Sequence, residues 1–126
     1  VLVFRAHSFM IYDKPGQRYF NATYAMLKAS AIFGIVIIEG ESPAQDPKGL
    51  TGYVNQSHVL IMTAKAGFTF LEKFEINANP NHTKNHKDGV YSLPPTLRGS
   101  LLRRSFRRAM RNIGESGRMT LKFIKP

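Results

Sequence analysis

Residues 32–38 read Ile-Phe-Gly-Ile-Val-Ile-Ile, an unbroken apolar run of strand length that ends in Glu39-Gly40-Glu41. Continuous branched side chains of this kind are typical of a strand that is buried on both faces of a parallel sheet. Residues 1–4, Val-Leu-Val-Phe, have the same character, and an amphipathic segment from about residue 18 to residue 28 lies between the two runs. This order predicts a βαβ unit with two parallel strands and a right-handed crossover.

The following part of the chain continues the alternation of turns, helices and strands. Residues 13–16, Asp-Lys-Pro-Gly, are expected to form a turn, and the polar stretch 42–52 is expected to form a loop. A helix capped by Asn55 or Ser57 is predicted to run to about residue 65. Gly67 then occupies the position after the helix, where a left-handed residue is favoured.

The C-terminal part is predicted to hold two strands, a long loop and a helix. Residues 68–76 favour a strand, and residues 77–98, which have little periodicity, form either an ordered functional loop or a wrapping segment. Residues 100–112 favour a helix. Its apolar stripe is made by Leu102, Phe106, Ala109 and Ile113. The alternation of residues 119–123, Met-Thr-Leu-Lys-Phe, predicts a half-buried terminal strand.

The composition indicates a globular α/β domain with one unusually basic segment. Of the 126 residues, 43% are hydrophobic and 21% are charged, which is enough apolar surface for a core and excludes wholesale disorder. The formal net charge is +10. Residues 1–97 hold nine basic and seven acidic side chains, whereas residues 98–126 hold nine basic side chains and one acidic one. The excess positive charge therefore belongs to the C-terminal quarter of the chain.

The residue types also exclude several classes of function. The sequence has no cysteine, so disulfides, a thiolate nucleophile, cysteine-bound zinc and iron–sulfur clusters are excluded. No apolar run approaches the roughly 20 residues that span a bilayer. The sequence begins at Val1 and shows no signal peptide, so its localisation is unknown: cytoplasmic, or periplasmic if a signal peptide precedes Val1.

Short motifs follow one another along the chain in a characteristic order. They are Gly52-Tyr53-Val54, Ala66-Gly67-Phe68, the segment from Glu75 to Pro80, the segment from Leu93 to Leu97, Ile113-Gly114-Glu115-Ser116, and the segment from Arg118 to Phe123. In this order and spacing, residues 1–126 resemble the C-terminal half of a class I S-adenosylmethionine-dependent methyltransferase, and in particular a group of bacterial predicted methyltransferases. The resemblance implies an α/β fold: a partial Rossmann-like sheet with flanking helices and an antiparallel C-terminal strand.

The same resemblance implies that part of the family's fold lies outside this sequence. In the family, a Gly-rich loop after the first strand and an acidic residue after the second strand bind S-adenosylmethionine. Neither motif exists here, so residues 1–126 are expected to form a single domain that begins near the fourth strand and lacks the N-terminal cofactor-binding strands. We expect this fragment to be inactive alone, to bind the cofactor poorly, and to self-associate through its open sheet edge.

Polar residues that follow the first two strands are the candidate site residues, because open α/β sheets bind ligands at the carboxyl ends of their strands. By the resemblance, residues 5–8 lie beside the transferring methyl group, although they depart from the Arg-Asn-x-His pattern of the group. His7 is the candidate general base and Arg5 the second catalytic candidate. Ser8 and Glu39 are placed on the substrate side, and the substrate is expected to be a small molecule.

These assignments have structural alternatives. His7 could serve only to hydrogen-bond a loop, and Arg5 could pair with Glu39 or Glu41 across the strand ends. His82 and His86 are four residues apart, as metal ligands sometimes are. Their segment is rich in Asn and Lys and offers no third ligand, so a solvated loop is the favoured interpretation and no metal is assigned.

An alternative function from a different class is a non-catalytic basic module. The polar face of the helix predicted over residues 100–112 carries Arg103, Arg104, Arg107, Arg108 and Arg111. Such a face can bind nucleic acid or another polyanion, including an anionic membrane surface, or can be a solvated face that keeps the chain soluble. It has no aromatic residue on which bases could stack, so nucleic acid is not the favoured partner.

Overall fold

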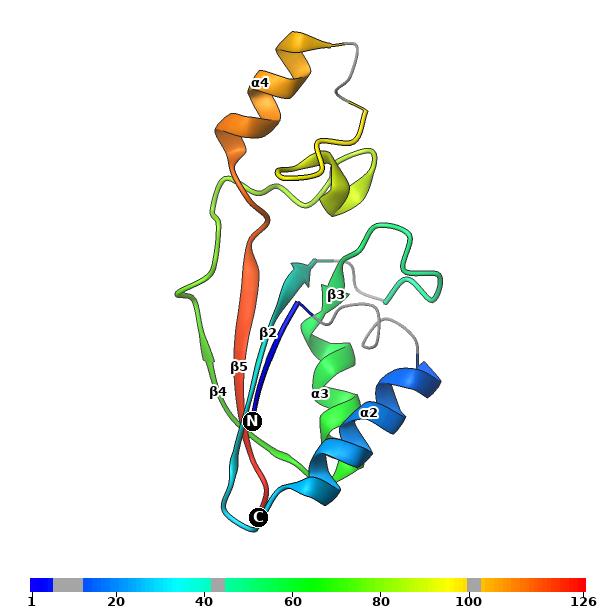
Figure 1. Cartoon of the computed structure of the whole chain (residues 1–126), viewed down its shortest axis with the longest axis vertical. Helices are drawn as coiled ribbons and strands as arrows, with labels where there is room; N and C mark the ends of the chain where they lie inside the picture. Colours follow the sequence, from blue (N-terminus) through cyan, green and yellow to red (C-terminus); the bar gives the residue numbers. More distant parts are fainter. Residues whose placement is uncertain (6–12, 42–44, 100–102) are drawn as a thin grey trace.

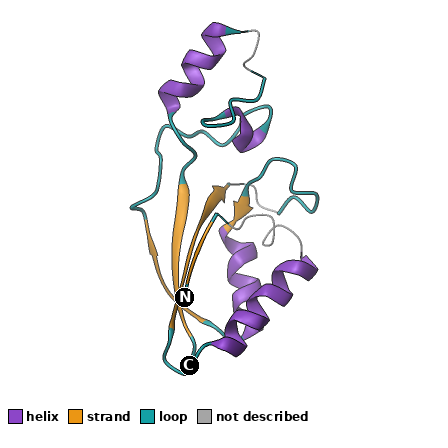
Figure 2. Ribbon diagram, viewed as in Figure 1, coloured by secondary structure: helices purple, strands orange, loops and turns teal. Residues whose placement is uncertain are grey.

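A computed structural model of the chain describes residues 1–5, 13–41, 45–99 and 103–126 as a mixed α/β structure (Figures 1 and 2). The elements, in order, are β1 (Leu2–Phe4), α2 (Asp13–Met26), β2 (Ile32–Gly40), β3 (Val54–Asn55), α3 (Gln56–Ala66), β4 (Thr69–Phe74), the 3-10 helix η1 (Gly89–Ser92), α4 (Arg104–Ile113) and β5 (Arg118–Ile124). None of the helices in these described ranges is long and apolar enough to cross a membrane.

The strands form an open sheet in the order β1-β2-β5-β4, and the short strand β3 pairs with the end of β2. Strand β1 runs parallel to β2, as the βαβ pattern predicts. Strand β5 is antiparallel to both β2 and β4, which confirms the prediction for the terminal strand. Because β5 lies between β2 and β4, most of the pairing in this sheet is antiparallel.

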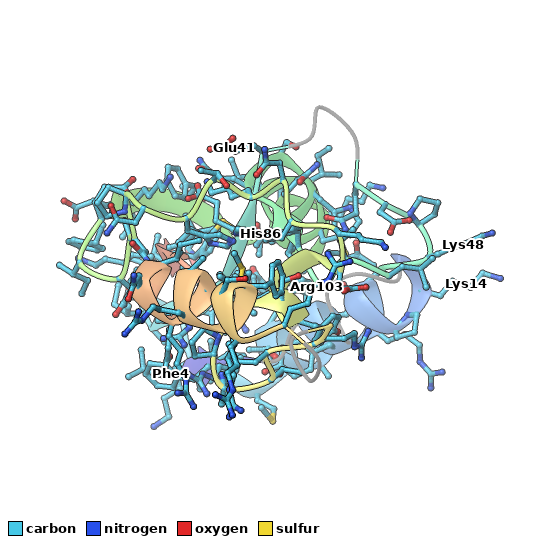
Figure 3. All side chains as sticks on the ribbon, turned by 90° about the horizontal axis from the view of Figure 1, so that it is seen from above. Phe4, Lys14, Glu41, Lys48, His86 and Arg103 are labelled. Atoms are coloured by element: carbon cyan, nitrogen blue, oxygen red, sulfur yellow. The ribbon has the colours of Figure 1, made fainter. Side chains whose placement is uncertain are left out.

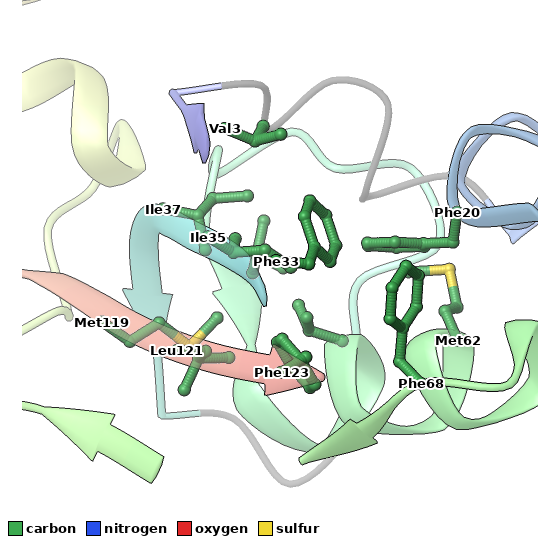
Figure 4. Packing of buried hydrophobic residues seen from close by; sticks show 12 residues of the cluster. Val3, Phe20, Phe33, Ile35, Ile37, Met62, Phe68, Met119, Leu121 and Phe123 are labelled. Atoms are coloured by element: carbon green, nitrogen blue, oxygen red, sulfur yellow. The ribbon is translucent and has the colours of Figure 1, made fainter. Parts of the chain in front are cut away.

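Alternate residues of β2 and β5 form the core together with α2 and α3, which lie on one side of the sheet (Figures 1 and 4). The fully buried side chains of the two strands are Phe33, Ile35, Ile37, Met119, Leu121 and Phe123. Phe68 stacks on Phe33 with ring centroids 4.9 Å apart, and Phe20 of α2 meets Phe33 edge-on at 6.1 Å. Each of these buried side chains contributes about 1.5–3 kcal/mol of transfer free energy, so this layer is the main source of stability.

Helix α2 begins earlier than its apolar periodicity predicts. Residues 13–16, which were expected to form a turn, make the first turn of the helix. Pro15 is compatible with this position because residues in the first turn have no carbonyl within the helix to which they could donate. Residues 13–16 therefore have a composition typical of turns but begin a helix.

Strand β4 is shorter and more exposed than predicted. It ends at Phe74, and its pairing with β5 shifts between Phe70 and Glu72. Such a bulge breaks the two-residue alternation of a strand, and the strand ends before residue 76, where the sequence predicts its end. Ile76 lies beyond the strand and is 80% exposed.

The structure agrees in part with the predicted caps of α3 and with the predicted apolar stripe of α4. Gly67 follows α3 with a φ of 105°, the left-handed conformation expected there, and Asn55 precedes α3 without a side-chain capping bond. On α4, Met110 is buried and Ala109 is exposed. Met110, rather than Ala109, therefore belongs to the apolar stripe of this helix.

The parallel strands β1, β2 and β4 end at one edge of the sheet, and the connection from β4 to β5 lies beyond that edge (Figure 1). A close backbone contact holds this connection against the loop that precedes β3. The N–H of Val90 donates to the carbonyl of Thr51 at 2.9 Å. Gly89 has a φ of +59°, and a Cβ there would collide with the backbone of Thr51. Only glycine fits this contact.

Candidate functional site

The first group of polar residues at the carboxyl edge is centred on Glu39. In β2, Ile37 faces the core, and Glu39 follows two residues later on the same face. Its carboxylate accepts hydrogen bonds from the Nζ atoms of Lys73 at 2.6 Å and Lys84 at 3.4 Å. Lys84 also forms an ion pair with Glu41 at 3.1 Å. Glu39 is thus present at the predicted edge, where it is neutralised by two lysines.

The charge state of Glu39 follows from these contacts. Burial raises the pKa of Glu39, but the hydrogen bonds and ion pairs with Lys73 and Lys84 outweigh that effect, so the pKa lies below its ordinary value. The pKa of Lys73 is raised in turn: burial lowers it, and Glu39 and Glu75 more than compensate. An ionised carboxylate with two cationic partners is a weak base, so Glu39 is suited to hold Lys73 and Lys84 in place.

The second group is a buried hydrogen-bonded pair, Tyr53 and His82. The Tyr53 hydroxyl lies 2.8 Å from Nε2 of His82, and Nδ1 of His82 accepts a hydrogen bond from the backbone N–H of Gly117 at 3.0 Å. A backbone N–H can only donate, so Nδ1 carries no proton in the neutral ring. The proton of neutral His82 is therefore on Nε2, which donates to the Tyr53 oxygen. This arrangement leaves the Tyr53 hydroxyl proton free to donate to a further group.

Both members of the pair are uncharged at neutral pH. Burial, together with the charges of His86 and Lys84, lowers the pKa of His82 to about 4, against an opposing effect of Glu41. Burial raises the pKa of Tyr53 to about 12. The pair is therefore a neutral hydrogen-bonding unit with a fixed direction of donation.

His86 completes this group. Its ring stacks on that of His82, with centroids 5.5 Å apart and an angle of 8° between the planes. The Nε2 atom of His86 is buried and has no hydrogen-bond partner among the described residues. Burial also lowers the pKa of His86. The interpretation of this segment as a solvated loop is wrong for His82, which is 4% exposed, because Tyr53 and Gly117 hold it inside.

A cavity of about 540 Å³ adjoins this group. Its lining residues are Gly40, Glu41, Asp46, Thr51, Tyr53, Asn55, Thr83, Lys84, Asn85 and His86. Seen from above, His86 lies near the middle of the molecule, whereas Lys14 and Lys48 lie at the periphery (Figure 3). A second, smaller cavity of about 220 Å³ is lined by Glu39, His82 and Lys84 among others. The carboxyl edge therefore has both hollow space and polar side chains.

Two residues bring His82 to this position: Asn79, which belongs to the motif from Glu75 to Pro80, and Gly117, which lies between the last two motifs of the sequence. The side chain of Asn79 donates to the carbonyls of Ile113 at 2.8 Å and Glu115 at 2.7 Å, and its own oxygen accepts from the N–H of Asn81. Gly117 has no room for a side chain because a Cβ would lie 2.9 Å from the backbone nitrogen of Asn79. The sequence therefore shows the two parts of this site, the Asn79-Pro80 turn and the distant Gly117. It does not show that the two parts are in contact.

Three of the predicted site residues follow β1 in the sequence. Arg5 directly follows β1 and forms an ion pair with Glu115 at 2.9 Å, and Glu115 also pairs with Arg118 at 2.6 Å. The expected partners of Arg5, Glu39 and Glu41, are instead paired with lysines. His7 and Ser8 lie outside the described residues.

The arginines of α4 form an exposed surface. Arg103, Arg104, Arg107, Arg108 and Arg111 are all exposed, and none forms an ion pair with another residue in the described parts of the chain. A hollow of about 740 Å³ is lined by four of them. Helix α4 lies at the end of the molecule remote from α2 and α3 (Figure 2). This surface is separate from the cavity beside Tyr53.

Metal ligation and cofactor binding each depend on particular residues in the part of the chain that the structure describes. Within residues 1–5, 13–41, 45–99 and 103–126, no group of three or more His, Asp or Glu side chains is placed to hold a metal ion. The sequence contains no G-x-G-x-x-G pattern for a dinucleotide or nucleoside cofactor. The cavity of about 540 Å³ has room and polar lining groups for a small molecule.

Comparison with known proteins gives a likeness in fold. No protein-family model and no curated protein sequence matches the chain. The crystal structure of the [4+2]-cyclase SpnF is similar in fold, with a TM-score of 0.59 over 99% of this chain and 14% sequence identity. The chain spans about half of that structure, 49% of its length. At this identity the likeness shows the fold alone, and it supports a class I methyltransferase-like fold.

Proposed function

We propose that this chain is the substrate-side part of a class I S-adenosylmethionine-dependent methyltransferase that acts on a small molecule. The observation that carries the proposal is the order of the sheet, in which an antiparallel terminal strand, β5, lies between β2 and β4. The likeness to SpnF and the order of the sequence motifs support the same fold. The polar groups at the carboxyl edge lie where open α/β sheets place their ligands.

The described residues do not themselves fit S-adenosylmethionine. The sequence has no Gly-rich loop, and the carboxylates Glu39 and Asp46 at the edge are already engaged, Glu39 by lysines and Asp46 by the backbone N–H groups of Lys48 and Leu50. We therefore propose that the cofactor is held by strands N-terminal to Val1. The part of this chain is to bind and orient the methyl acceptor, since positioning can supply much of the catalysis in a group transfer.

Calorimetric titration of S-adenosylmethionine tests this proposal. We expect saturable binding to the full-length gene product that contains this sequence, and much weaker binding to residues 1–126 alone. S-Adenosylhomocysteine should compete for the same site. The absence of binding to the full-length product would contradict the proposal.

A second candidate function rests on the arginine surface of α4. Five exposed arginines without acidic partners among the described residues are suited to track the phosphates of a polyanion such as RNA. We expect binding to RNA to weaken steeply as salt rises, and to weaken further in a variant with Arg103, Arg104, Arg107 and Arg108 changed to Ala. Lys14→Ala with Lys48→Ala is the matched control elsewhere on the surface. Binding that does not depend on salt would exclude this function.

A further inference from the structure

The hydrogen bonds around Tyr53 have a fixed direction. Gly117 donates to Nδ1 of His82 at 3.0 Å, so the proton on Nε2 points to the Tyr53 oxygen at 2.8 Å. The Tyr53 hydroxyl proton is then available for an acceptor outside this pair. Tyr53 lines the cavity of about 540 Å³, and its hydroxyl has no other hydrogen-bond partner among the described residues. A ligand oxygen in the cavity would accept this proton.

His86 supplies the second observation. It lines the same cavity, and its buried Nε2 lacks a partner in the described part of the chain. Nε2 is shielded from the cavity in this conformation, and an unpaired buried polar atom costs about 1–3 kcal/mol, so a small rotation of the His86 ring that brings Nε2 to a ligand in the cavity would be favourable. A neutral ring nitrogen either donates or accepts, depending on the tautomer. A hydroxyl group suits both cases because it can do either.

The charges around the cavity restrict the ligand further. Lys84 is the one cationic side chain among the lining residues, and it is paired with Glu39 and Glu41. Glu41 and Asp46 are the acidic lining residues. Asp46 accepts from the backbone N–H groups of Lys48 and Leu50, both at 2.9 Å. Because cation and carboxylates are already satisfied, the cavity offers no unpaired charge to a charged ligand.

We propose that the cavity between β3 and the loop of residues 83–86 is a binding site for an uncharged, hydroxyl-bearing small molecule, with Tyr53 as hydrogen-bond donor and His86 as the second polar contact. The proposal concerns binding and goes beyond the methyl transfer proposed above. It holds for the chain whether or not a cofactor binds elsewhere. A negative result for binding to this cavity would therefore be distinguishable from a negative result in the titration with S-adenosylmethionine.

Phenol is a suitable probe because it joins one hydroxyl to an uncharged ring. We would titrate it into the full chain and follow the ring resonances of Tyr53 and His86 by NMR. We expect saturable shifts with a dissociation constant on the order of 1–10 mM, as for other ligands of this size. Toluene, which has the same shape without the hydroxyl, should bind about tenfold more weakly, and benzoate should also bind more weakly. These three ligands test the proposal without any variant.

Variants then assign the contacts. Tyr53→Phe and His86→Phe should each weaken phenol binding roughly five- to tenfold, because each removes one hydrogen bond and keeps the ring. Tyr24→Phe, on α2 and outside the cavity, is the matched control and should leave the affinity unchanged. Equal binding of toluene and phenol, tighter binding of benzoate, or the absence of saturable shifts would each overturn the proposal. The last result would mean that the cavity holds only water.

Discussion

The segment from Glu115 to Arg118 is held by two polar groups of opposite character. On one side, the N–H of Gly117 donates to buried, neutral His82, which in turn meets Tyr53. On the other side, Glu115 lies between Arg5 and Arg118 with its side chain 56% exposed. The buried group has one hydrogen-bonding direction and no charge, whereas the exposed group has full charges in contact with water.

This difference shows where function is expected at the carboxyl edge. Water screens the exposed ion pairs, so they add little to stability and select no ligand. In the buried group, a hydrogen bond that is not made costs free energy, so the geometry of the group is fixed. A donor or acceptor without a partner in this group therefore indicates a specific ligand contact. These differences support the binding site that we propose beside Tyr53 and His86, while the assignment of Arg5 stays a prediction.

The largest expected effect is that of Gly89→Ala on the buried side of the edge. A Cβ at this position would collide with the backbone of Thr51, and the φ of +59° disfavours any side chain. We expect a loss of roughly 3 kcal/mol or more in the free energy of unfolding, measured by urea denaturation. Gly99→Ala is the matched control: its φ is +78°, but the nearest atom to a Cβ is a side-chain oxygen of Asp88 at 3.1 Å. Equal losses in the two variants would show that the contact with Thr51 is not tight.

The next effect is a dependence of stability on pH that comes from His82. Its pKa is about 4 in the folded chain and 6.5 in the unfolded chain, so between these values the unfolded chain binds a proton that the folded chain does not. The contribution of His82 is therefore complete above about pH 6.5 and is lost as the pH falls through 4. The full loss amounts to about 3 kcal/mol.

Denaturation at a series of pH values with the variant His82→Asn checks this prediction. The asparagine oxygen can still accept from the N–H of Gly117, but the side chain does not titrate. We expect the variant to be less stable at pH 7 and to lose less stability between pH 6.5 and pH 4.5. His58→Gln, on α3, is the control and should keep the steep profile. A variant profile as steep as that of the unchanged chain would remove His82 as the cause.

The same contrast explains what the sequence could predict. The local sequence pattern was sufficient for β2 and β5: an unbroken apolar run predicted β2, a two-residue alternation predicted β5, and neither pattern needs knowledge of distant contacts. Glu39 was correctly expected at the strand end, but its partners lie 34 and 45 residues away. The environment of His82 depends on Tyr53, 29 residues earlier, and on Gly117, 35 residues later. An Asn- and Lys-rich composition indicates solvent exposure unless such long-range contacts are known.

A smaller effect is expected for the partly buried ion pairs around Glu39. Glu39→Gln keeps the shape of the side chain but leaves Lys73 and Lys84 with less compensation, and all three side chains are at most 25% exposed. We expect a loss of about 1–2 kcal/mol at pH 7, measured by denaturation. The matched control is Glu75→Gln, because Glu75 also pairs with Lys73 but is 63% exposed. A loss as large in the control would mean that burial does not distinguish the two carboxylates.

The smallest effect is expected on the exposed side, and it gives the most direct test of the comparison. Arg5 and Glu115 have side chains 58% and 56% exposed, so solvent screens their ion pair and the flexible side chains lose entropy in forming it. In a double-mutant cycle with Arg5→Ala and Glu115→Ala, we expect a coupling energy below about 0.5 kcal/mol that vanishes at high salt. The hydrogen bonds and charges of Arg118 and Arg5 lower the pKa of Glu115, so any coupling should also weaken in acid as the carboxylate becomes protonated. A coupling above about 1 kcal/mol that persists at high salt would show that the exposed group is as constrained as the buried one, and it would favour Arg5 as a candidate site residue.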